Sequence, residues 1–352
     1  LLFTSGSTGE PKGVPISHAS LDAYVRNIGA VVGGVGPGDR IAHLADLTFD
    51  ISVHDMFVAW LNGAAVHSIP ENASLMATRF VQDQALTGWF SVPSTAGLLK
   101  QAGQLEPGAM PSLRFTLFCG EALTGQVAEA WCAAAPNARV FNLYGPTEAT
   151  VAFTSFLYEP GQSDPPPVVA LGEPYPGQEI GLFQPDAPRR VDAGAAGEIC
   201  LTGSQVTAGY WRAPELNAKR FFEAEGKRWY RTGDLGRRDA KQGYLFAGRV
   251  DHQVKIRGYR VELQEIEFVL RQASGRDVVA VVPWPASADG GATGCVGFIA
   301  GPQGDAEALR AACRERLPDY MTPSAIVFLA EMPLNASGKV DYPRLRAHPS
   351  LV

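Results

Sequence analysis

The feature that most constrains the fold of this chain is an alternation of short β-like runs with helical runs over residues 1 to about 155. Strands of a few residues separated by helices of 10–13 residues are typical of a mostly parallel sheet covered on both faces. We expect strands at residues 40–50, 64–69, 87–93, 113–120 and 138–145, and helices at residues 51–63, 94–103 and 125–136.

The remainder of the chain has a different texture. From about residue 163 to 248, short strands and Gly/Pro turns predict a β-rich region. Beyond it, helices are expected at residues 260–272 and 306–318, with strands at 278–284, 295–300 and 325–332. We therefore predict an α/β protein with two domains, a large one over residues 1–250 and a small α+β one over residues 251–352.

Composition excludes several classes of function. The net charge of −6 offers no basic face for nucleic acid. No apolar run approaches the roughly 18 residues that cross a membrane, and no signal peptide is visible. Five widely spaced cysteines without a C-x-x-C pair indicate neither zinc nor a disulfide framework. A cytoplasmic, reducing location is expected. Because the chain begins in mid-strand without Met, we expect it to be a piece of a longer polypeptide.

The chain opens on "LLFTSGSTGEPKG", where an apolar run enters a stretch of Ser, Thr and Gly that ends near Lys12. A P-loop does not fit, because Pro11 precedes Lys12 and Gly13 follows it. Glycine still lets backbone N–H groups approach an oxyanion, and hydroxyls add further donors. These residues alone leave two interpretations open, an anion cradle and an ordinary surface loop.

Four more stretches carry polar residues that a plain loop would not need. "FNLYGPTEAT" places an aromatic ring, a hydroxyl and a carboxylate at a strand end, where open α/β sheets bind ligands. "WYRTGDL" places Asp234 in a turn, where it could accept the hydroxyls of a ribose. A charged run surrounds the expected domain boundary near Asp251, and Lys339 lies in a turn near the C-terminus. Each of them alone is equally compatible with a solvated turn or face.

Together the five stretches resemble the amino-acid adenylation domains of nonribosomal peptide synthetases, which are adenylate-forming enzymes. The motifs that carry the resemblance run in family order from residue 3 to residue 341: "FTSGSTGEPKG", "FDISVHDMF", "NLYGPTEAT", "GEICLTGSQVTAGYW", "YRTGDL", "GRVDHQVKIRGYRVELQEIE" and "NASGKVD". By this resemblance, we expect the part of the family fold that precedes the first motif to lie outside this chain. Some stretches also resemble stand-alone D-alanine–carrier protein ligases.

The resemblance implies a reaction and its cofactors. ATP and Mg²⁺ activate an amino acid as its adenylate, and the acyl group then passes to the phosphopantetheine thiol of a carrier protein. Thr147 would contact the α-phosphate, Glu148 would ligate Mg²⁺, and Lys339 would bridge the substrate carboxylate and the phosphate. The chain would pivot at Asp251 so that the stretch with Lys255 replaces Lys339 for thiolation.

The remaining nucleotide contacts follow by the same resemblance. The opening loop would hold pyrophosphate, Tyr144 would stack on adenine, and Asp234 would bind the ribose between two flanking residues. The implied nucleotide-binding residues are Thr4, Ser5, Gly6, Ser7, Thr8, Gly9, Lys12, Tyr144, Asp234, Phe246 and Arg249.

The implied amino-acid pocket begins at Asp50, the match to the family residue that pairs with the α-ammonium group. A buried carboxylate needs such a partner. The other implied lining residues are His54, Ser91, Leu117, Cys119, Gly120, Leu143, Val151 and Ala152. They carry no charge that would pair with a charged side chain, and His54 and Ser91 leave room for one hydrogen bond. We expect a small or medium neutral substrate, such as alanine of either hand, serine or valine.

Alternatives of other classes remain at this point. An acyl- or aryl-CoA ligase would share the nucleotide site but would not need Asp50. A non-catalytic domain would bind a nucleotide or a partner protein without turnover. Expected partners are an amino acid and a carrier protein, with a helper protein possible, and neither nucleic acid nor a membrane.

Overall fold

The structure is a computed structural model of the chain. It describes residues 1–4, 11–70, 76–161, 163–185, 187–250, 253–276, 278–285, 291–334 and 340–351. The chain forms two compact units, one made of Leu1–Phe3 and Gly13–Val250 and the other of Thr4–Lys12 and Asp251–Val352.

The first unit contains a mixed sheet in the order β4-β3-β5-β6-β7-β8-β9. Its first five members in this order run parallel, and β8 and β9 are antiparallel. The strand bounds are β3 Arg40–His43, β4 Ala65–Ser68, β5 Gly88–Ser91, β6 Phe115–Phe118, β7 Arg139–Tyr144, β8 Thr154–Leu157 and β9 Glu173–Pro174. The predicted α/β architecture with a mostly parallel sheet is confirmed.

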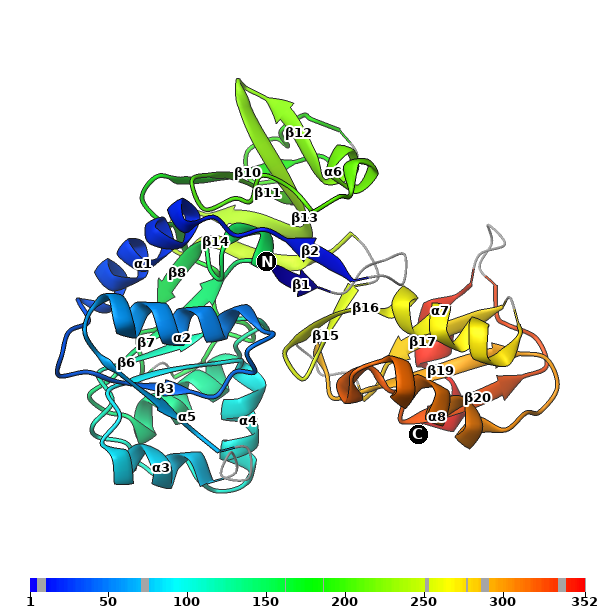
Figure 1. Ribbon diagram of the computed structural model, residues 1–352, viewed down its shortest axis with the longest axis horizontal. Coiled ribbons are helices and arrows are strands. Elements are labelled where there is room, and N and C mark those ends of the chain that lie inside the picture. The colour runs from blue at the N-terminus through cyan, green and yellow to red at the C-terminus, as the bar shows by residue number, and fades with distance from the viewer. Residues whose placement is uncertain are drawn as a thin grey trace. The chain divides into compact units, whose positions relative to one another are not determined.

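Helices cover both faces of this sheet (Figure 1). Their bounds are α1 His18–Val32, α2 Asp50–Leu61, α3 Ala77–Gln84, α4 Pro93–Gln101 and α5 Gly125–Ala134. Because strand side chains alternate between faces, Trp89 packs with the side of α3, α4 and α5, and Phe90 packs with the side of α1 and α2. This alternation decides which residues of β5 can reach α2.

The predicted strand over residues 40–50 is longer than the observed one. β3 ends at His43, and α2 begins at Asp50 after an extended Phe49. An acidic residue in the first turn of a helix is favoured by the positive end of the helix dipole. Asp50 therefore belongs to the helix, which holds its carboxylate at the helix N-terminus.

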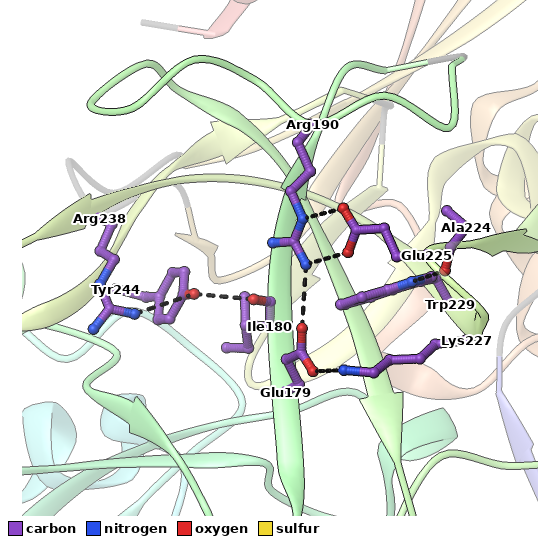
Figure 2. Close-up of polar contacts among 9 residues, drawn as sticks. All are labelled: Glu179, Ile180, Arg190, Ala224, Glu225, Lys227, Trp229, Arg238 and Tyr244. Carbon is purple, nitrogen blue, oxygen red and sulfur yellow. Dashed lines mark hydrogen bonds and ion pairs between the residues drawn. The ribbon is translucent and has the colours of Figure 1, made fainter.

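The β-rich region of the first unit is an antiparallel sheet in the order β10-β11-β13-β12, with β14 paired to β13. Its elements are β10 Gln178–Phe183, β11 Gly197–Gly203, α6 Pro214–Arg220, β12 Phe221–Ala224, β13 Lys227–Asp239 and β14 Gly243–Arg249. Its surface carries a network of ion pairs around Arg190 (Figure 2).

A short two-stranded sheet and a short helix are also present. β1 Leu2–Thr4 pairs with β2 Lys12–Val14, and the 3₁₀ helix η2 spans Thr147–Ala149. Backbone hydrogen bonds tie Gly13 to Trp211, at 2.8 Å from Gly13 O to Trp211 N.

The second unit is a small α+β fold with two three-stranded sheets, β16-β15-β18 and β17-β19-β20. Its elements are β15 Gln253–Ile256, β16 Tyr259–Glu262, α7 Leu263–Ser274, β17 Val279–Pro283, β18 Gly291–Ala292, β19 Cys295–Ala300, α8 Ala306–Arg316, η3 Asp319–Met321, β20 Ala325–Leu329, α9 Tyr342–Arg346 and η4 Pro349–Leu351. Its core joins α7 and α8 to the strands.

The helix predicted over residues 260–272 begins later than expected. Residues up to Glu262 pair as β16 with β15, where Val261 opposes Val254. β-branched residues fit a pleated surface better than a helix, so the helix begins only at Leu263. Among the described residues, no helix is both long enough and apolar enough to cross a membrane.

Candidate active site

Asp50 and Thr147, 97 residues apart in the chain, are joined by a hydrogen bond. The Thr147 hydroxyl donates to Asp50 Oδ2 at 2.7 Å. Asp50 lies in the first turn of α2, and Thr147 begins η2 directly after Pro146. Both come from segments that follow the carboxyl ends of strands β3 and β7, the edge where open α/β sheets bind ligands.

The backbone after η2 is strained. Thr150 and Val151 both have positive φ, 59° and 67°, although β-branched residues rarely adopt this region. Gln205 holds the turn, because its Nε2 donates to Ala152 O at 2.8 Å and to Ala149 O at 3.3 Å. Such strain persists only where the surroundings enforce it, and it clusters at functional sites.

Two glycines of this region are required by geometry. A Cβ on Gly145 would lie 2.7 Å from Ala152 Cα and 2.8 Å from Phe153 N, too close for any side chain. Gly120, two residues after the end of β6, has a φ of 96°, which favours glycine.

Glu148 is fully buried and accepts a 2.5 Å hydrogen bond from the Tyr210 hydroxyl. Tyr210 in turn lies 3.1 Å from Tyr230, oxygen to oxygen. In the described part of the chain, no group of three or more His, Cys, Asp or Glu side chains gathers to hold a metal. Mg²⁺ commonly takes one or two protein carboxylates together with substrate phosphates, so a single Glu148 fits that ion.

Asp234 lies between Tyr144 and Arg249. The Tyr144 hydroxyl donates to Asp234 Oδ2 at 2.6 Å, and Arg249 forms an ion pair with Asp234 Oδ1. Burial, and next the Asp234 carboxylate, raise the pKa of Tyr144, so its hydroxyl keeps the proton that it donates. Phe246 packs against the same core cluster as Tyr144. The structure thus brings four predicted nucleotide residues together.

His54 lies one helical turn after Asp50 and is buried against Phe90, with ring centroids 4.6 Å apart. The Tyr24 hydroxyl is 2.7 Å from His54 Nδ1. Burial lowers the pKa of His54 to about 3, so the ring is neutral. His54 Nε2 has no hydrogen-bond partner among the described residues.

Ser91 does not share the surroundings of His54. Its hydroxyl accepts from Trp89 Nε1 at 2.9 Å and donates to Val92 O at 3.2 Å. Trp89 packs on the side of α3, α4 and α5. The strand residue that packs against the His54 ring is Phe90, whereas the Ser91 hydroxyl contacts Trp89 and Val92.

The other predicted lining residues share one core cluster with α1 and α2. This cluster includes Leu117, Cys119, Leu143, Val151 and Ala152. The Cys119 thiol lies 3.9 Å from Val151 O. An apolar lining of this kind suits a neutral ligand group.

A second buried pair lies beside His54. His43 Nδ1 is 3.0 Å from Asp55 Oδ2, and Asp55 is completely buried. Burial raises the pKa of Asp55 to about 7, and the hydrogen bond that His43 donates to the Asp55 carboxylate raises the pKa of His43. Both shifts mean that the folded pair holds a proton more tightly than the unfolded chain does.

In the second unit, Lys12 is buried and forms a 3.4 Å ion pair with Glu262. The Thr4 hydroxyl is buried without a hydrogen-bond partner among the described residues. Lys255 lies on β15 opposite Arg260. The predicted residues Ser5, Gly6, Ser7, Thr8, Gly9, Asp251 and Lys339 lie outside the described residues.

Sequence reasoning missed Tyr24, Gln205 and Tyr210. Gln205 and Tyr210 lie within "GEICLTGSQVTAGYW", a motif that we recognised but to which we assigned no residue role. Tyr24 lies in α1, where it is one apolar-face residue among several, and no local signal marks it.

A pocket of about 350 Å³ on the β-rich sheet holds none of the predicted residues. Arg190, Arg238 and Tyr244 are among its lining residues. Figure 2 shows Arg190 in contact with two carboxylates, Arg238 with the Tyr244 hydroxyl, and that hydroxyl with a backbone carbonyl. It lies apart from the residues gathered around α2.

Comparison with protein families matches residues 1–211 to the AMP-binding enzyme family and residues 265–339 to the AMP-binding enzyme C-terminal domain. Tyrocidine synthase 2 of Brevibacillus parabrevis is 36% identical over 97% of this chain, which spans only 9% of that protein. D-alanine–D-alanyl carrier protein ligase of Lacticaseibacillus casei is 33% identical over 97% of this chain and 69% of its own length.

Among solved structures, the adenylation domain AlmE of Vibrio cholerae, in complex with glycyl-adenosine-5′-phosphate, superimposes with a TM-score of 0.90. It is 35% identical, and the match covers 98% of this chain and 65% of that one.

Proposed function

Because the chain belongs to the AMP-binding enzyme family of adenylating ligases, we propose that it activates a small or medium neutral amino acid with ATP and transfers it to a carrier protein. The first product is the aminoacyl adenylate together with pyrophosphate. The acceptor in the second step is the phosphopantetheine thiol of the carrier.

The observation that carries the proposal is the hydrogen bond between Thr147 and Asp50. By the family resemblance, Asp50 holds the α-ammonium group and Thr147 contacts the α-phosphate. The carboxylate of an amino acid lies next to its ammonium group, so a contact between these side chains supports the approach of the carboxylate to the phosphate. Holding two reactants in attacking geometry removes much of the entropic barrier.

Two anions must react in the first step, so their repulsion has to be offset. A carboxylate oxygen forms a bond to the α-phosphorus, and the bond from that phosphorus to pyrophosphate breaks. Mg²⁺, when bound at Glu148, supplies charge neutralisation on the phosphates. Lys339 adds a positive charge between the two reacting groups. In the second step the thiolate sulfur bonds to the acyl carbon, and AMP leaves.

The nucleoside is proposed to bind beside Asp234. The carboxylate of Asp234 can accept hydrogen bonds from ribose hydroxyls once its bond with Tyr144 is exchanged for them. Arg249 orients the carboxylate through their ion pair. Phe246 and the Tyr144 ring offer apolar faces to the base.

The test of the function is amino-acid-dependent exchange of pyrophosphate into ATP, measured with the whole protein that carries this chain. We expect exchange with at least one small neutral amino acid. Turnover with a fatty or aryl acid and free CoA, but with no amino acid, would contradict the role of Asp50.

Variants of Lys339 and Asp251 separate the two half-reactions. Lys339→Ala is expected to lower adenylate formation nearly to background, whereas Lys241→Ala, a surface lysine in the β-rich region, retains it. Asp251→Pro is expected to keep exchange but to slow the loading of the holo carrier protein, followed by its mass. Equal loss of both half-reactions in Asp251→Pro contradicts the hinge role.

A further inference from the structure

His54 carries an unsatisfied polar atom in the core beside α2. The ring is 1% exposed, its Nδ1 lies 2.7 Å from the Tyr24 hydroxyl, and its Nε2 has no hydrogen-bond partner among the described residues. Buried polar atoms in folded proteins nearly always have a partner. An unpaired one at a binding site therefore points to a group that the ligand supplies.

The hydrogen-bond network assigns the tautomer of His54. Tyr24 is completely buried, and its hydroxyl proton has one acceptor within reach among the described residues, His54 Nδ1. If Tyr24 donates to Nδ1, a single polar group is left over, the Nε2–H. If Nδ1–H donates instead, both the Tyr24 proton and the Nε2 lone pair are left unpaired in the core. The first arrangement costs less, because each unpaired buried group carries a desolvation penalty.

The charge states agree with this assignment. Burial, the largest effect, together with Tyr175 and Cys119 raises the pKa of Tyr24, so the phenol keeps its proton. Burial keeps His54 neutral, with a pKa of about 3. A neutral ring cannot balance the charge of a buried carboxylate, so an acidic substrate side chain does not fit this position.

The position of His54 relative to Asp50 sets which substrate atom can reach it. The two residues are four apart on α2, so they lie on one face with Cβ atoms about 5–6 Å apart. A substrate whose α-ammonium group pairs with Asp50 would present its side-chain β and γ atoms one helical turn farther along. The atom that meets Nε2–H has to be a hydrogen-bond acceptor.

We propose that Tyr24 fixes His54 as an Nε2–H donor that selects neutral amino acids carrying a side-chain oxygen, such as serine or threonine, over their apolar counterparts. The inference rests on the proposed function and narrows its substrate class. Tyr24 acts through His54 and is a positioning residue, whereas His54 would touch the substrate.

An apolar substrate side chain would leave a buried hydrogen-bond donor of the site without an acceptor. Alanine or valine would leave the Nε2–H unpaired, or would need a trapped water with further polar partners. Leaving a buried donor unpaired costs about 1–3 kcal/mol, which is roughly 10- to 100-fold in selectivity. This is the discrimination that we expect between isosteric substrates.

The experiment compares kcat/KM for pyrophosphate exchange with two matched substrate pairs, serine against alanine and threonine against valine. In the native protein the oxygen-bearing member of at least one pair should be preferred about 10- to 100-fold. His54→Phe should bring that ratio to one or below, whatever its effect on the total activity. Tyr24→Phe should lower the ratio several-fold with little change in activity toward the apolar member.

The matched control is Tyr158→Phe. Tyr158 is also a tyrosine with 2% exposure, but its hydroxyl donates to Glu129 at 2.8 Å on the other side of the sheet. This variant should leave both ratios unchanged. If Tyr24→Phe lowers activity with both members of a pair equally, its role is structural and the positioning role is refuted.

A readout independent of activity tests the tautomer itself. The sequence has six histidines, so ¹⁵N-histidine labelling with ¹H–¹⁵N correlation through two- and three-bond couplings can resolve His54. We expect neutral His54 with the proton on Nε2 at pH 7, and loss of that single tautomer in Tyr24→Phe. A proton on Nδ1, or a charged ring, overturns the inference.

Different results would refute the proposed function and the selection by His54. Absence of exchange with every amino acid would refute the proposed function. Exchange that prefers glycine, alanine or valine, with ratios unaffected by His54→Phe, would keep the function and refute the selection by His54.

Discussion

Two polar networks of the first unit differ in how much water reaches them. Around α2, the pairs Tyr24–His54 and His43–Asp55 are largely buried, and the most exposed of the four side chains, that of His43, is 14% exposed. On the β-rich sheet, Arg190 pairs with Glu225 at 2.7 Å and with Glu179 at 3.1 Å, and these side chains are 38–48% exposed (Figure 2).

The degree of burial decides how much each network contributes to stability and to ligand recognition. Exposed ion pairs exchange protein partners for water at little cost, so they add little to stability. Buried polar groups gain more from a partner and lose more without one. Unpaired atoms such as His54 Nε2 and Asp55 Oδ1 occur in the buried network. We therefore expect ligand recognition in the buried network and not in the exposed one.

The largest effect is expected for Asp234→Ala. The change removes the carboxylate that pairs with Arg249 and accepts from Tyr144, and breaking such a buried pair costs about 3–5 kcal/mol. Urea unfolding followed by tryptophan fluorescence measures the loss. A cost below about 1 kcal/mol would mean that this pair contributes no more to stability than an exposed ion pair does.

Asp50→Ala is expected to lower amino-acid-dependent exchange about 100-fold, because removing one partner of a buried charge pair costs roughly 2–5 kcal/mol. The loss should appear in kcat/KM for the amino acid, and KM for ATP should change little. Arg190→Ala, in the exposed network, serves as the control and should keep exchange within about twofold. Unchanged exchange in Asp50→Ala would remove this residue from the substrate site.

The His43–Asp55 pair predicts a pH dependence of stability. The folded-state pKa of Asp55 is raised to about 7 and that of His43 is also raised. Folding therefore binds protons, and stability is expected to fall as pH rises from 6 to 8, by about 1 kcal/mol for Asp55. Asp55→Asn should flatten this slope.

The control variant for this pH dependence changes Tyr24, a titratable neighbour of Asp55. Tyr24, which is electrostatically coupled to Asp55, has a raised pKa and does not titrate in this range. Tyr24→Phe should therefore keep the slope. If the free energy of unfolding of Asp55→Asn still falls as steeply between pH 6 and 8, another group is responsible.

The smallest effect is expected for Lys227→Ala. Lys227 pairs with Glu179 and is 49% exposed, so its removal should cost less than about 1 kcal/mol, and less still at high salt. Unfolding in low and in 1 M salt measures the difference. A salt-independent loss of stability above about 2 kcal/mol would show that solvent exposure does not distinguish the two networks.

The sequence by itself determined the alternation of strands and helices, the motif residues and their order. These are local signals. The apolar residues within 113–120 suffice to predict the strand that forms β6. Gly and Pro mark turns through their own backbone dihedral preferences. The strand ends at His43 and Glu262 were predicted wrongly, because pairing and helix-dipole effects at element ends compete closely.

Only the tertiary structure decided which motif residues meet. The hydrogen bond between Asp50 and Thr147 joins residues 97 apart, and no local pattern encodes it. Phe90, and not its neighbour Ser91, packs against the His54 ring, because Phe90 lies on the face of β5 that turns toward α2. A one-residue change of register would reverse the two faces. The partner of His54 is Tyr24, an unmarked core residue of α1, and packing alone brought the two together.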